Sequence, residues 1–113
     1  MEGELGMAEF NKVHVEGFVK RDAQALVPRS NVQFIDFCLV VQDPTNRKNG
    51  VFVDCFASGS VVEDELEGFV SAGESLAVDG FLTFRSYSDV HGKTHTGMVV
   101  YVEHAEEIEE DVD

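Results

Sequence analysis

The chain has 113 residues, enough for one compact domain, and its formal net charge of −14 excludes a protein that is basic over its whole surface. No apolar run is long enough to span a membrane, and the acidic start MEGELGMAEF does not resemble a signal or transit peptide. We therefore expect a cytoplasmic protein. Cys38 and Cys55 should act as small hydrophobic residues, with a disulfide or metal pair as the less favoured alternative because no CxxC spacing is present.

The negative charge is concentrated at the two ends of the chain. Residues 1–11 contain three acidic residues and no base, and residues 101–113 contain seven and no base. All eight Lys and Arg therefore lie between the ends, where a local basic face is possible. The predicted organisation is an acidic arm, a folded domain and an acidic tail, at residues 1–10, 11–103 and 104–113.

Alternating apolar residues predict three strands in the first half of the chain. The strands cover residues 11–19, 34–41 and 51–57. The side chains expected to face inward are Val13, Val15, Gly17 and Val19 in the first strand, Ile35, Phe37, Leu39 and Val41 in the second, and Val53, Cys55 and Ala57 in the third. The third strand should then present Phe52, Asp54 and Phe56 on its other face.

A helix is predicted after the third strand. Ser60 and Glu63 form the S-x-x-E pattern of a capping box, and Gly73 is suited to end a helix in a left-handed conformation. Val62, Leu66, Phe69 and Val70 share one helical face. We expect this helix to close one end of a β structure.

Residues 74–102 predict a long β-hairpin with a turn near Gly92. One face of its first strand should enter the core and the other should be exposed. The expected core residues are Leu76, Val78, Leu82 and Phe84, and the exposed face includes Phe81, Arg85 and Tyr87. An exposed row of two rings around a guanidinium can stack on bases and pair with phosphate, or pack on a neighbouring subunit. The residues alone leave both interpretations open.

The order of three strands, a helix and two strands predicts an all-β protein with an OB-fold. This fold is a five-stranded Greek-key barrel, here with one helix between strands three and four, and its second and third strands usually bind oligonucleotides.

The chain also resembles the bacterial single-stranded-DNA-binding protein family over residues 11–103. Five segments match that family in order and spacing: NKV at 11–13, RDA at 21–23, FCLVV at 37–41, VFVDCFASG at 51–59 and GFLTFRSYSDVHG at 80–92. The resemblance implies sequence-tolerant binding of single-stranded DNA in replication, recombination or repair. It also implies a nucleoid-associated homotetramer whose minimal unit is a symmetric dimer. Replication or repair proteins are the protein partners that the resemblance implies.

The resemblance assigns roles to individual residues. Phe52 and Tyr87 correspond to the family's base-stacking aromatics, and Arg85 and Lys12 to its basic positions. The first strand pairs with its symmetry mate in the family, which makes Val13 and Val15 the expected interface positions. The outward face of the hairpin adds Phe81 to the residues expected to bind DNA. On electrostatic grounds we also expect the basic residues of the loops to contact phosphates, namely Lys20, Arg21, Arg29, Arg47, Lys48 and Lys93.

The sequence also departs from the family pattern. It has no Trp, Asp54 replaces a common base, Thr83 a second Arg and Ser58 an aromatic residue, and the final EEIEEDVD lacks the Pro-Phe ending that partner enzymes bind. These departures lower the expected DNA affinity. They keep open an alternative from another class, an OB-fold protein-interaction subunit similar to the primosomal replication protein N family. An RNA-binding cold-shock-like barrel is disfavoured because aromatic RNP-type clusters are missing.

No motif indicates an enzyme, a cofactor or a metal site. His91 and His95 lie on either side of a turn, so they do not share a helix face as zinc-binding pairs do. The sequence has no G-x-S-x-G pattern, no phosphate loop and no Cys-His arrangement with an orienting acid. We expect a binding protein whose partners are single-stranded DNA and its own copies, without a membrane.

Overall fold

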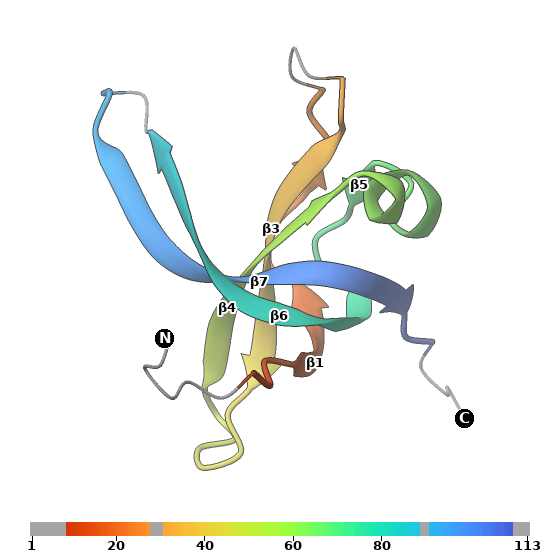
Figure 1. Ribbon diagram of the computed structural model, residues 1–113. Helices are drawn as coiled ribbons and strands as arrows, with labels where there is room; N and C mark the ends of the chain where they lie inside the picture. Colours follow the sequence, from red (N-terminus) through yellow and green to blue (C-terminus); the bar gives the residue numbers. More distant parts are fainter. Residues whose placement is uncertain (1–8, 28–30, 89–90, 110–113) are drawn as a thin grey trace.

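The computed structural model describes residues 9–27, 31–88 and 91–109, and its main feature is a closed β-barrel (Figure 1). The barrel strands occur in the order β1-β3-β4-β7-β6. Their bounds are Val13–Val19 (β1), Phe34–Gln42 (β3), Gly50–Ser58 (β4), Ser75–Ser88 (β6) and Thr94–Glu107 (β7). Two short strands, β2 (Ala23–Gln24) and β5 (Phe69–Val70), pair with each other outside the barrel. This arrangement is the predicted all-β, five-stranded OB-fold.

The barrel interior follows the alternation of the sequence. Ile35, Phe37 and Leu39 of β3 are buried, as are Cys55 and Ala57 of β4. Successive side chains of a strand point to opposite faces, so the intervening residues of β3 and β4 must lie on the outer surface. Burial raises the pKa of the Cys55 thiol to about 12, which keeps that side chain neutral in the core.

The predicted helix is the main error in the sequence-based fold. The structure has only a one-turn π-helical segment, η1 (Val61–Glu65), and the Ser60 side chain makes no capping hydrogen bond. Val62, Leu66 and Val70 are buried as expected, but Val70 belongs to β5 and pairs with Ala23 of β2. This pairing with a distant segment replaces the later turns of the helix.

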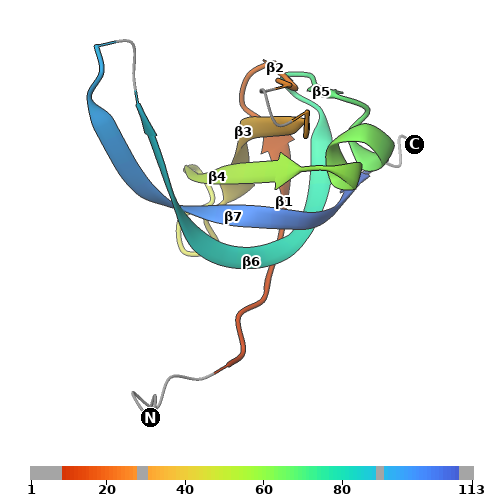
Figure 2. The same cartoon turned by 45° about the horizontal axis from the view of Figure 1, so that its top comes forward.

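The strands β6 and β7 are longer than the barrel and extend beyond it as a two-stranded arm (Figures 1 and 2). Leu76 and Val78 are buried, as predicted for the inward face of β6. The same prediction is wrong for Leu82 and Phe84, which are 42% and 73% exposed. Both lie further along β6, where the arm leaves the barrel and the inward side of the strand has no core to contact.

The β1 strand is paired unevenly along its length. Residues 13–18 pair with β6, whereas only Phe18 and Val19 pair with β3. Val13 and Val15 are half-buried and pack against the barrel's own core. At the other end of the chain, β7 continues to Glu107. Within the described residues, no helix has the length and apolar character needed to cross a bilayer.

Candidate nucleic-acid interface

A groove of about 970 Å³ lies over the outer faces of β3 and β4. Its floor includes Asp36 and Cys38 of β3 and Phe52 and Asp54 of β4, all residues that the strand alternation turns away from the core. The segment after β1 contributes Lys20 and Arg21 to the lining, and β6 contributes Arg85. The groove thus combines an exposed ring with charged side chains of both signs.

Phe52 is the most accessible ring of the groove. The residue is 62% exposed, and the Nζ atom of Lys20 lies 4.0 Å from the ring centroid. A cation at this distance from a ring face makes a cation–π contact. Because Lys20 is itself exposed, a planar group could take its place on the ring without uncovering buried surface.

Arg85 is held more firmly than Lys20. Its guanidinium carbon lies 4.1 Å from the centroid of Phe56 and 5.6 Å from that of Phe34. One of its nitrogens lies 3.4 Å from Oδ2 of Asp36, and the side chain is only 24% exposed. The rings and the carboxylate fix the guanidinium at the side of the groove, with its charge partly offset by Asp36.

Four rings form an aromatic row across the outer surface of the barrel: Phe34, Phe56, Tyr101 and Phe81, in that order. Neighbouring centroids are 5.8, 5.8 and 5.1 Å apart, and Phe81 stacks on Tyr101 at an interplanar angle of 19°. The Tyr101 hydroxyl also lies 2.7 Å from Oγ of Ser58. Phe81 is consequently half-buried and does not line the groove, contrary to the expectation that its ring is freely exposed.

The charges of the groove nearly cancel, although the whole chain is strongly acidic. Its lining contains the bases Lys20, Arg21 and Arg85 and the acids Asp22, Asp36 and Asp54. Burial raises the pKa of the Asp36 carboxyl, while the positive charge of Arg85 acts in the opposite direction. The acidic character of the chain is therefore not focused on this channel.

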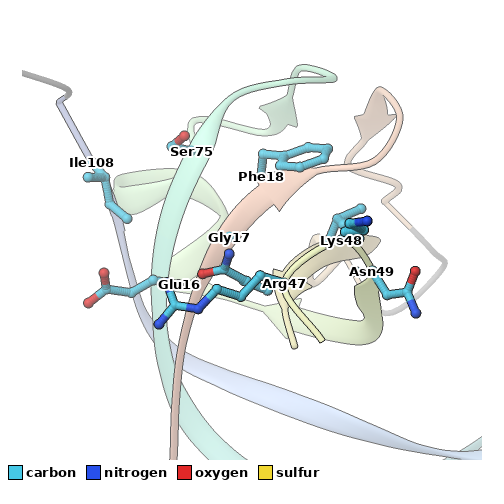
Figure 3. Close-up of a pocket in the computed structure, with 11 residues that line it drawn as sticks. Glu16, Gly17, Phe18, Arg47, Lys48, Asn49, Ser75 and Ile108 are labelled. Carbon is cyan, nitrogen blue, oxygen red and sulfur yellow. The ribbon is translucent and has the colours of Figure 1, made fainter. Parts of the chain in front are cut away.

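A second hollow, of about 540 Å³, contains the predicted cations Arg47 and Lys48 (Figure 3). Phe18 of β1 lines it together with these two side chains. Val40 pairs with Phe18 on one side and with Phe52 on the other, so the three side chains form a strip across β1, β3 and β4. This strip connects the groove with the second hollow.

Residues 10–108 match the Single-strand binding protein family. The chain belongs to this family. No curated protein matches the sequence.

Among solved structures, the fold is similar to that of a deletion mutant of the single-stranded DNA binding protein from Thermus aquaticus, with a TM-score of 0.72 and 22% sequence identity. The similarity covers 100% of this chain and 47% of that chain, so the family member described here spans about half the length of its neighbour. The likeness confirms the OB-fold.

The remaining predicted site residues of this family member lie in different places. Lys12 and Lys93 are exposed and do not line the groove, while His95 of the arm does. Arg29 lies outside the described residues, and so does the side chain of Tyr87, whose backbone pairs with His95. Within the described ranges, no group of three His, Cys, Asp or Glu residues could hold a metal ion.

Sequence reasoning did not assign a role to three of the rings, Phe34, Phe56 and Tyr101. The alternation that predicts an outward position for Phe52 also predicts outward positions for Phe34 and Phe56. Their contact with Arg85 depends on the position of the arm relative to β3 and β4, which no local pattern contains.

Proposed function

We propose that this protein binds single-stranded DNA along the groove, with little demand on sequence. The observation that carries the proposal is Phe52, a largely exposed ring on the floor of a channel bordered by Lys20 and Arg21. Exposed aromatics beside cations bind single strands because every base has a face that can stack and the cations can pair with phosphate. The family to which the chain belongs supports the same activity.

The proposed binding step begins at Phe52. A base stacks on the ring in place of the Lys20 ammonium, and the displaced ammonium then pairs with a neighbouring phosphate. Arg85 keeps its contact with Phe56 and supplies a second, fixed positive charge. The strand continues over Phe18 toward Arg47 and Lys48, along the strip that joins the two hollows.

A fluorescence-anisotropy titration with labelled oligo-dT at increasing salt concentration tests this function. Each neutralised phosphate contributes about −0.7 to the slope of log K against log salt for a single strand. The groove and the second hollow together offer five cations, Lys20, Arg21, Arg47, Lys48 and Arg85, so we expect a slope between about −2 and −3.5. Absence of binding at low salt would contradict the proposal.

We further propose that the protein acts in replication, recombination or repair as a homotetramer built from symmetric dimers. The uneven pairing of β1 supports the dimer. Residues 13–17 pair with β6 alone among the described strands, which leaves the other edge of this stretch available to the same strand of a second copy.

A protein-interaction subunit is the second candidate function. Leu82, Phe84 and Met98 favour it, since these apolar side chains are exposed on the arm, away from any core. The two functions predict different results for Phe52→Ala. Loss of the ring weakens binding of oligo-dT in the first case and leaves a protein partner's binding unchanged in the second.

A further inference from the structure

Asp54 is the groove residue that phosphate binding does not explain. It lies on the outer face of β4 between Phe52 and Phe56, and its side chain is exposed. Within the described part of the chain, no hydrogen bond or ion pair engages its carboxylate. A negative charge on the floor of the groove repels a phosphate backbone, so any favourable contact of Asp54 with a bound strand would be with a base.

An ionised carboxylate accepts hydrogen bonds and donates none, and its two oxygens can accept two parallel donors. Guanine presents two adjacent donors on its Watson–Crick edge, the N1–H and the N2 amino group. Cytosine and adenine each present one amino group there. Thymine presents a single N3–H between two carbonyl oxygens, which a carboxylate repels. A carboxylate at the edge of a stacked base therefore favours guanine most and thymine least.

The position of Asp54 suits such a contact. Residues two apart on one face of a strand are separated by about 6.6 Å, so a base stacked on Phe52 extends to the neighbourhood of the Asp54 side chain. Lys20 approaches the same ring and can hold the phosphate of that nucleotide. The base edge and the phosphate would then contact opposite charges.

Asp36 is less suited to this contact than Asp54. Its carboxylate faces Arg85 at 3.4 Å, and the same guanidinium covers Phe56 at 4.1 Å. The ring beside Asp36 is thus already occupied by a partly buried group, whereas the group on Phe52 is an exposed lysine.

We propose that Asp54 contacts the edge of the base stacked on Phe52 and gives the groove a preference for guanine over thymine. The inference rests on the proposed binding of single strands. It adds an order of preference among bases that can all stack.

Three labelled oligomers of equal length test the preference in the wild-type protein. The first is oligo-dT, the second has every third thymine replaced by guanine, and the third has deoxyinosine at the same positions. Deoxyinosine keeps the N1–H and lacks only the N2 amino group. We expect the guanine oligomer to bind about tenfold more tightly than oligo-dT, with the inosine oligomer between them.

The variant Asp54→Asn removes the charge and keeps the size of the side chain. It should abolish the guanine preference while binding oligo-dT at least as tightly as the wild type, because one repulsive charge is lost. Asp64→Asn is the matched control, since it removes an exposed charge of η1 outside the groove and should keep the preference.

Equal affinities for the guanine and thymine oligomers in the wild type would overturn the inference, and so would a preference that survives in Asp54→Asn. Failure of all three oligomers to bind would overturn the proposed function together with it. The two failures are therefore distinguishable.

Discussion

His14 lies on the outer face of β1 with a carboxylate against each ring nitrogen. Its Nδ1 is 2.7 Å from Oδ1 of Asp79, and its Nε2 is 2.8 Å from Oε2 of Glu16. Only the protonated imidazole can donate from both nitrogens. The hydrogen bond to Glu16, followed by that to Asp79, therefore raises the pKa of His14 above its ordinary value of 6.5.

This shift makes a prediction for stability against pH. A folded-state pKa above the unfolded one stabilises the protein fully below about pH 6.5, and the stabilisation is lost as pH rises through the raised pKa. Urea unfolding of the wild type and His14→Gln should therefore differ more in free energy near pH 6 than near pH 9. A difference that is independent of pH would show that the two carboxylates do not favour the protonated ring.

Gly80 lies at the register shift between β6 and β7, where β6 also pairs with Val13 of β1. A Cβ atom at this position would overlap the backbone carbonyl oxygen of Tyr101. We expect Gly80→Ala to lower the free energy of unfolding by about 1–3 kcal/mol, because one of the paired backbones must move.

Gly97 in β7 provides the matched control for that experiment. Nothing lies within 4 Å of a Cβ atom built there, so Gly97→Ala should change the free energy of unfolding by less than about 1 kcal/mol. Chemical denaturation of both variants measures the difference. Equal effects would mean that the close approach at Gly80 does not constrain the hairpin.

At the level of the elements, alternation was sufficient to predict β3, β4 and the inward part of β6, because period-two burial is a local property. Alternation did not predict exposure correctly where a strand extends beyond the core, as β6 does at Phe84. The helix prediction failed for a related reason. Val62, Leu66 and Val70 fit one helical face, yet the same burial is achieved by a single turn and a strand that pairs with β2.

The groove could be predicted only in part. Alternation placed Phe52 and Arg85 on outer faces, and both line the groove. The stacking of Phe81 on Tyr101 follows from the pairing of β6 with β7, and the placement of Arg47 and Lys48 in a separate hollow follows from the closure of the barrel. Such relations join distant segments, and a single sequence contains no pattern for them.

For the whole molecule, the open edge of β1 predicts self-association. Sedimentation velocity at micromolar concentration should give a mass of two or four chains. Substitution of Val13 or Val15 would not isolate this contact, because both side chains also pack against the barrel core. A mass of one chain would contradict the proposed dimer and leave the groove as a monomeric binding surface.

Because the groove is near-neutral and the protein as a whole is acidic, we expect base stacking to contribute more to the free energy of DNA binding than net charge does. The most direct test compares Phe52→Ala with Phe84→Ala in titrations with labelled oligo-dT. Phe52 lies in the groove, whereas Phe84 is a comparably exposed ring of β6 that does not line the groove.

We expect Phe52→Ala to weaken binding by about 1–3 kcal/mol. Phe84→Ala should bind oligo-dT as the wild type does. Unchanged affinity of Phe52→Ala, or an equal loss in both variants, would contradict the assignment of single-strand binding to the groove.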